Sequence, residues 1–138
     1  MAEKTLILPA SAADLEALAR LDRHISREEL FHSIARGRVL TAKSGARLTG
    51  WLRYNLFWDN TPFLNLLYIL EEVRGLGIGG ALLRLWEERM AQAGHRLVMT
   101  STLSNEPAQQ FYRSHGYRDA GCLLLEGEPA ELFLTKRL

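Results

Sequence analysis

Four glycines follow an apolar segment near the middle of the chain and open a run with helical spacing. Gly75, Gly77, Gly79 and Gly80 lie close together, and Arg74 comes directly before them. Backbone N–H groups at a helix N-terminus are unpaired and partly positive, and glycine lets an anion approach them closely. A mere connection would not need so many glycines, since each one inside a helical turn costs about 1 kcal/mol relative to alanine. The segment therefore predicts a phosphate-binding loop.

The residues around the glycines discriminate between known phosphate loops. A Walker A loop needs Lys followed by Ser or Thr after its last glycine. Ala81-Leu82 follow here, which excludes a nucleotide triphosphatase. The dinucleotide pattern G-x-G-x-x-G occurs at Gly75, Gly77 and Gly80. It expects an acidic residue about 20 positions further on, at the end of the next strand, and Leu97–Leu103 has none. A nicotinamide-dependent oxidoreductase stays an alternative that rests on these three glycines alone.

A third pattern, Arg-x-x-Gly-x-Gly, is met by Arg74, Gly77 and Gly79, and a second segment accompanies it. Residues 105–117 read Asn-Glu-Pro-Ala-Gln-Gln-Phe-Tyr-Arg-Ser-His-Gly-Tyr. In these segments the sequence resembles the GNAT superfamily of N-acetyltransferases, whose second motif is Asn-x-x-Ala-x-x-Phe-Tyr-x-x-x-Gly-Phe. Only the final aromatic departs, since tyrosine stands here where phenylalanine is commoner. The specific resemblance covers about residues 64–117.

The resemblance implies acetyl-CoA as cosubstrate and implies which residues bind it. The backbone at Tyr68 and Ile69 would pair with the pantetheine arm and the acetyl group, and Asn105 would contact the same arm. Tyr112 would lie beside the thioester sulfur and, as general acid, would protonate the departing thiolate. The residues implied to surround the pyrophosphate are Arg74, Gly75, Leu76, Gly77, Ile78, Gly79 and Gly80.

The implied reaction is direct acetyl transfer to a primary amine in a ternary complex. A backbone N–H near Ile69 would stabilise the oxyanion of the tetrahedral intermediate. A lysine-type ammonium has a pKa near about 10.4, so a base or a water chain must take its proton. Some relatives use a Glu on the strand after the main helix, whereas Thr100–Thr102 carries no carboxylate. A coenzyme A-binding sensor or regulatory module without turnover is therefore the second hypothesis.

The acceptor is expected to enter past the N-terminal helices and the loop before the central strand, as the resemblance implies. The candidate substrate residues there are Trp58 and Asn65. Trp58 and the neighbouring Asp59 would hold a cation by ring face and charge, while capping of the sheet edge is the other interpretation of Trp58. Compatible acceptors are a peptide N-terminus, a lysine, a polyamine, an aminoglycoside or a small metabolite amine.

Length and composition limit the class of protein. The 138 residues, 47% hydrophobic, fit one domain over residues 1–138. A net charge of +1, with basic and acidic residues interspersed, argues against nucleic acid as a partner. Cys122 is the only cysteine, so neither an intramolecular disulfide nor a metal site of Cys pairs is expected, and Cys122 is interpreted as a small hydrophobe. The sequence shows neither a signal-peptide pattern nor an apolar stretch long enough to span a membrane, so a cytoplasmic protein is expected. The resemblance also allows a homodimer.

Hydrophobic periodicity and turn residues predict the elements that must position these residues. They give the order β-α-α-β-β-β-α-β-α-β-β, a mixed α/β (α+β) class with a central sheet flanked by about four helices. Ser11 with Asp14, and Ser26 with Glu29, mark the starts of the first two helices. The predicted central strand is Phe63–Leu70, preceded by a loop at residues 58–62.

The helix that begins in the glycine loop is predicted to end near Ala93, before Gly94. Its apolar face is predicted from the helical spacing of Ile78, Leu82, Leu85, Trp86 and Met90. The polar residues expected to point away from the core are Arg84, Glu87, Glu88 and Gln92.

Overall fold

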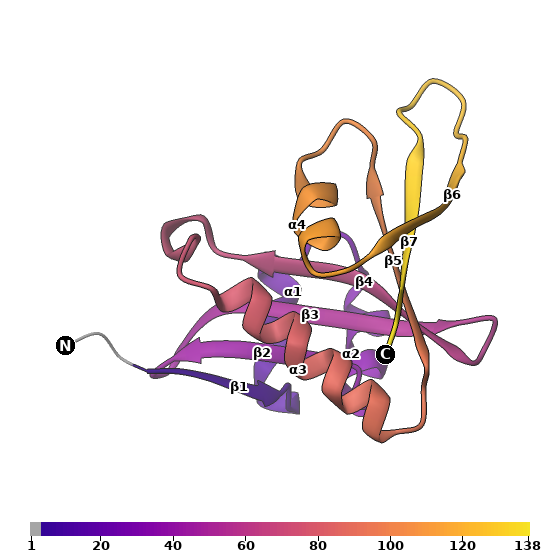
Figure 1. Cartoon of the computed structure of the whole chain (residues 1–138). Coiled ribbons are helices and arrows are strands. Elements are labelled where there is room, and N and C mark those ends of the chain that lie inside the picture. The colour runs from indigo at the N-terminus through magenta and orange to yellow at the C-terminus, as the bar shows by residue number, and fades with distance from the viewer. Residues whose placement is uncertain (1–3) are drawn as a thin grey trace. The chain divides into compact units, whose positions relative to one another are not determined.

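Seven strands and four helices make up the described part of the chain, residues 4–138, in the computed structural model (Figure 1). The strands are β1 (Thr5–Pro9), β2 (Val39–Ser44), β3 (Arg47–Phe57), β4 (Thr61–Ile69), β5 (Leu97–Leu103), β6 (Arg118–Leu123) and β7 (Glu131–Arg137). The helices are α1 (Leu15–Leu21), α2 (Arg27–Ala35), α3 (Ile78–Gln92) and α4 (Ala108–Ser114), with single 3₁₀ turns η1 (Ala12–Asp14) and η2 (Glu71–Val73). This order confirms the predicted fold class.

The strands form one mixed sheet in the order β1-β2-β3-β4-β5-β7-β6, so β4 is central as predicted. β1 with β2, β2 with β3, β5 with β7 and β6 with β7 pair antiparallel. β4 and β5 pair in parallel, through Phe63 with Met99 and Leu64 with Thr100. Parallel neighbours need a crossover connection, and α3 supplies it.

The elements group into two compact units. The first contains the residues up to Asn55 together with Leu66–Trp86, and the second contains Leu56–Asn65 and Glu87–Leu138. In the first unit, α1 and α2 lie on one face of the strands and α3 lies on the other (Figure 1). Its core cluster contains Leu18, Leu30, Ile34, Val39 and Trp51. The buried residues of the second unit include Leu64, Val98, Tyr112, Tyr117 and Leu134.

Both predicted helix starts are confirmed by hydrogen bonds. The Ser26 hydroxyl accepts a bond of 3.2 Å from the Glu29 N–H, which begins α2. The Asp14 carboxylate accepts a bond of 2.8 Å from the Ser11 N–H, and η1 leads into α1. These side chains satisfy backbone groups that the first helical turn leaves unpaired.

The loop predicted at residues 58–62 is shorter in the structure, because Thr61 and Pro62 belong to β4. Trp58 and Asp59 have φ values of 56° and 64°, and these left-handed conformations reverse the chain within a few residues.

One polar residue of α3 is buried, although the apolar pattern of the helix places it away from the core. Glu87 was expected to point away from the core, but it is only 8% exposed, and Leu83, one helical turn earlier, is fully buried. The Tyr117 hydroxyl donates to Glu87 Oε2 at 2.8 Å, and Lys136 Nζ donates to Oε1 at 2.9 Å. A buried carboxylate is tolerated when both oxygens are paired in this way. Burial first, and then the Glu87 charge, raise the pKa of the Tyr117 hydroxyl.

A buried ion pair lies at the C-terminal end of α1. Asp22 is 2% exposed and accepts bonds from Arg53 Nε at 2.7 Å, from Trp51 Nε1 at 3.1 Å and from the His24 N–H at 3.1 Å. Burial by itself raises the pKa of Asp22, but the hydrogen bonds from Arg53 and His24, the Arg53 charge and the Trp51 bond together lower it below 3.8. The carboxylate is therefore ionised whenever the protein is folded near neutral pH.

We expect acid to weaken the fold through Asp22. A carboxyl whose pKa is lower in the folded state stabilises the fold above its unfolded pKa, and that contribution is lost as the pH falls through the folded pKa. In urea unfolding at fixed ionic strength, Asp22→Asn should lower the free energy of unfolding at pH 7 and converge with the wild type in acid. Glu88→Gln, which removes an exposed carboxylate of α3, is the control and should keep the wild-type acid dependence. Curves for Asp22→Asn and wild type that stay parallel would contradict this role.

Candidate active site

The glycine loop of the first unit has the geometry that an anion needs. Gly75 and Gly77 have φ values of 81° and 84°, which side chains rarely allow, and the space where a Cβ would lie is open at both. The first bond of α3 runs from the Ala81 N–H to the Gly77 carbonyl at 3.0 Å. The N–H groups of Ile78 and the next two residues precede that bond, so they are the orphan donors of the helix N-terminus.

The charges of this turn also favour an anion. The first turn of α3 carries no acidic side chain, so nothing within it opposes the positive end of the helix dipole. Leu76 projects from the loop and is 74% exposed, while Ile78 is 7% exposed and packs in the core. The loop is thus anchored at one end by Ile78 and open to solvent at its tip.

Arg74 is exposed, yet its side chain has two partners within the first unit. Its Nε donates to the Ile69 carbonyl at 2.8 Å, and its guanidinium carbon lies 5.2 Å from the centroid of the Tyr68 ring. The Tyr68 ring is half-exposed and packs at 5.0 Å from Trp51, which is buried. The side chain of Arg74, at the start of the glycine loop, therefore contacts the last two residues of β4.

Gly50 is a residue of this region that the sequence reasoning missed. A Cβ at Gly50 of β3 would lie 2.6 Å from Ile69 Cδ1 and 3.0 Å from the Tyr68 carbonyl oxygen. Only a residue without a side chain lets β3 lie this close to the two residues predicted to pair with the pantetheine arm. The available signal was a glycine within a strand pattern, which often marks a close backbone approach.

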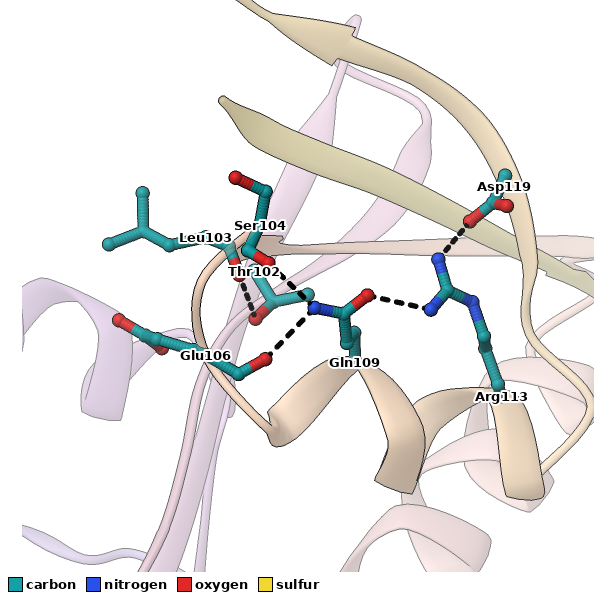
Figure 2. A network of polar contacts seen from close by, with 7 residues as sticks. All are labelled: Thr102, Leu103, Ser104, Glu106, Gln109, Arg113 and Asp119. Carbon is teal, nitrogen blue, oxygen red and sulfur yellow. Dashed lines mark hydrogen bonds and ion pairs between the residues drawn. The ribbon is translucent and has the colours of Figure 1, made fainter. Parts of the chain in front are cut away.

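In the second unit, the turn after β5 carries Asn105, which is exposed. The Gln109 side-chain amide donates to the carbonyls of Ser104 and Glu106, at 2.9 and 3.1 Å, on either side of Asn105 (Figure 2). Arg113 donates to Gln109 Oε1 at 2.7 Å. These bonds fix the backbone on both sides of Asn105, and Gln109 was not singled out from the sequence because it stands at a variable position of the motif.

Arg113 extends the same network toward β6, since its second terminal nitrogen donates to Asp119 Oδ1 at 2.6 Å (Figure 2). Asp119 follows Gly116 and Tyr117, the end of the second motif. One arginine of α4 therefore links the turn before the helix to the strand after it.

Tyr112 of α4 is 6% exposed, in the same unit as Asn105. Its ring meets that of Phe111 at 5.2 Å and that of Tyr117 at 5.5 Å, both edge to face. Burial raises the pKa of the Tyr112 hydroxyl to about 12, and a hydrogen bond with the Thr100 side chain acts in the opposite direction. The hydroxyl keeps its proton at neutral pH, so it acts there as a donor and not as a base.

Both predicted acceptor residues, Trp58 and Asn65, also belong to the second unit. Trp58 is 78% exposed, and its ring lies 4.7 Å from that of Phe57. The ring row continues from Phe57 to Phe63 at 6.1 Å and from Phe63 to Phe133 at 6.0 Å. Asn65 is exposed and, two positions after Phe63, projects from the same face of β4. Trp58 and Asn65 thus lie along one aromatic face of the sheet.

Glu71, Glu72 and His115 could act as bases by residue type, but each has another place in the structure. Glu71 and Glu72 are exposed, and Glu72 forms an ion pair with Arg47. His115 Nδ1 lies 2.9 Å from the Phe111 carbonyl, so this histidine belongs to the end of α4. Cys122 differs from its interpretation as a small hydrophobe, because it is exposed on β6, an edge strand whose residues are all exposed.

Within residues 4–138, no cluster of three or more His, Cys, Asp or Glu side chains has the arrangement to bind a metal ion. In the same described range, every helix is too short or too polar to cross a membrane.

A mixed sheet whose central strand leads into glycines at a helix N-terminus is the architecture of a phosphate-binding α/β protein. The sequence profile of the acetyltransferase (GNAT) family matches residues 9–117, and the chain belongs to this family. It is an acetyl-CoA-dependent N-acetyltransferase, and acetyl-CoA is its cosubstrate. The resemblance stated from the two motifs is thereby confirmed.

Individual relatives agree with this assignment. The chain is 29% identical over 145 residues to an uncharacterized N-acetyltransferase of Methanocaldococcus jannaschii, with 96% of this chain and 92% of the relative covered. Its fold is similar to that of a GNAT-family acetyltransferase from Bacillus cereus, with a TM-score of 0.79, 24% identity and 97% of both chains covered. It is also similar to the PaiA N-acetyltransferase of Thermoplasma acidophilum in complex with coenzyme A, with a TM-score of 0.83, 20% identity and 98% and 99% covered.

Proposed function

We propose that the protein transfers the acetyl group of acetyl-CoA directly to a primary amine, with both substrates bound together. The observation that carries this is the glycine loop of the first unit. Gly75 and Gly77 adopt positive φ beside open space there, and Arg74 directly precedes them. In this proposal Arg74–Gly80 holds the pyrophosphate, and the backbone of Tyr68 and Ile69 pairs with the pantetheine arm and the acetyl group. Asn105 contacts the same arm.

In the chemical step, the neutral amine nitrogen forms a bond to the acetyl carbon, and the carbon–sulfur bond then breaks. A backbone N–H near Ile69 stabilises the oxyanion that develops between these events. The amine proton leaves through water, because Thr100–Thr102 has no carboxylate to accept it. The thiolate departs and takes up a proton from water, which yields free coenzyme A.

Tyr112 is the donor that we propose for the departing thiolate. A hydroxyl with a pKa of about 12 is a weaker acid than a thiol, whose pKa is about 8.5 for cysteine-like groups. Full proton transfer to the sulfur is therefore uphill, and the main contribution of Tyr112 is a hydrogen bond that strengthens as negative charge develops. Burial favours this role, since a hydrogen bond to a charge is stronger where water is excluded.

The acceptor is proposed to bind along the aromatic face that contains Trp58 and Asn65. A ring row from Trp58 to Phe133 supports an acceptor with apolar groups near its amine, and Asn65 adds a polar contact. The family match runs through segments of both compact units, which supports the prediction that residues 1–138 act as one catalytic domain.

An acceptor screen tests the proposed function. The full chain is mixed with acetyl-CoA and with peptide N-termini, lysine, polyamines or aminoglycosides, and the release of free coenzyme A is followed. We expect release with one of these amine classes. Binding of acetyl-CoA, seen as a raised melting temperature, without release on any amine would favour the sensor hypothesis.

We expect intersecting initial-rate plots with the active amine, because direct transfer needs both substrates on the enzyme. Cys122→Ala should keep most of the activity, since no acetyl-enzyme forms. Parallel plots, the sign of a covalent intermediate, would overturn direct transfer.

A further inference from the structure

The side chain of Tyr68 has no role in the function proposed so far, which uses only the backbone of this residue. The ring is 41% exposed, whereas its neighbour Trp51 is 1% exposed, so the Tyr68 ring contributes less to the core. Its two ring contacts are Arg74 at 5.2 Å and Trp51 at 5.0 Å. An exposed tyrosine that lies against the one arginine of the proposed pyrophosphate loop calls for an explanation beyond packing.

Arg74 would be mobile without these contacts. An exposed arginine has many rotamers, and ordering it on binding costs conformational entropy. Here the Tyr68 ring lies under the guanidinium while the Ile69 carbonyl accepts a bond of 2.8 Å from Nε. Nε is occupied in this arrangement, and the terminal nitrogens are the donors that remain to face an anion.

The position of the Tyr68 ring is set in turn by buried groups. Trp51 is 1% exposed, and its indole N–H donates to Asp22, which Arg53 holds through Nε and a terminal nitrogen at 2.7 and 3.3 Å. All of these residues belong to the first unit. A continuous series of contacts thus runs from the buried Asp22–Arg53 ion pair, through the rings of Trp51 and Tyr68, to Arg74 at the start of the glycine loop.

We propose that the Tyr68 side chain is a positioning residue for coenzyme binding, which holds the Arg74 guanidinium ready for the pyrophosphate on a support fixed by Trp51 and Asp22. This inference rests on the proposed function, because it takes the loop to be the pyrophosphate site. It adds a side-chain role for Tyr68 that acts through Arg74 and does not require contact between the ring and the coenzyme.

The test is a double-mutant cycle on coenzyme A affinity, measured by calorimetry at low salt with the full chain. Tyr68→Leu removes the ring face and should raise Kd about 3- to 5-fold, the range expected of a cation–π contact. Tyr68→Phe keeps the ring and should stay within about 2-fold of the wild type on the same basis. Arg74→Ala should raise Kd about 10-fold, less so at high salt because exposed charges are screened. In the Arg74→Ala background, Tyr68→Leu should have no further effect.

The control for a general effect of removing an exposed ring is Phe31→Leu in α2, half-exposed in the same unit, which should leave Kd unchanged. A wild-type Kd for folded Tyr68→Leu would overturn the inference. Equal losses from Tyr68→Leu with and without Arg74 would also overturn it, because the ring would then act independently of Arg74. Failure of the proposed site itself is seen separately, as an unchanged Kd when Gly79 in the loop is replaced by valine.

Discussion

Tyr112→Phe is expected to slow acetyl transfer by about 10²-fold, the low end of what a general acid contributes. The substitution removes only the hydroxyl and keeps the ring contacts with Phe111 and Tyr117. The low end applies for two reasons: a thiolate is a fair leaving group, and a hydroxyl with a pKa of about 12 gives it a hydrogen bond more readily than a proton. The measurement is the single-turnover rate with the active amine, so that product release does not mask the chemical step.

The pH dependence of the single-turnover rate distinguishes hydrogen-bond donation by Tyr112 from other roles of this residue. Since Tyr112 titrates near pH 12, it remains a donor throughout pH 6–9, and the ratio of wild-type to Tyr112→Phe rates should be constant there. The matched control is Tyr117→Phe, which removes a neighbouring buried hydroxyl that donates to Glu87 and should affect stability more than the chemical rate. A wild-type chemical rate in folded Tyr112→Phe would remove Tyr112 from the mechanism and leave the fold and the loop untouched.

Gly79→Val should raise the Kd of acetyl-CoA by about 10²-fold or more. Gly79 stands in the first turn of α3, where an added side chain would keep the pyrophosphate away from the backbone donors. Each hydrogen bond to a charged group contributes about 1.5–3 kcal/mol, so the loss of two explains the size of the effect. Gly79 does not have a positive φ, so valine fits its backbone conformation. Calorimetry with acetyl-CoA measures the change without an acceptor.

Substitutions at two further glycines distinguish blocked coenzyme binding from backbone strain. Gly77 has a φ of 84° in the loop, so Gly77→Val should lower both the affinity and the melting temperature. Gly37 has a φ of 71° and open space around it outside the loop, so Gly37→Val should lower the melting temperature and leave the affinity unchanged. Unchanged affinity in folded Gly79→Val would refute the assignment of the pyrophosphate to this loop.

Much of the fold could be predicted from the sequence, because the signals concerned are local. Ser26 and Glu29 are three positions apart, and their hydrogen bond needs only the first turn of a helix. The apolar residues of β4 and of α3 repeat with the period of their own element. The glycine loop and the segment from Asn105 to Tyr117 were recognisable for the same reason, since each is one continuous stretch. The β3–β4 turn was misjudged because two left-handed residues, Trp58 and Asp59, close it earlier than their types suggest.

Tertiary structure decided what depends on residues far apart in the chain. Glu87 was expected in solvent, but its partners Tyr117 and Lys136 lie 30 and 49 positions away. Gly50 matters only because β3 lies against the Tyr68–Ile69 backbone, and the pKa of Tyr112 is raised chiefly by the burial that folding imposes. Helical periodicity specifies which side of an element a residue occupies. Whether that side meets water, an apolar core or a charged partner is determined only when another element packs against it.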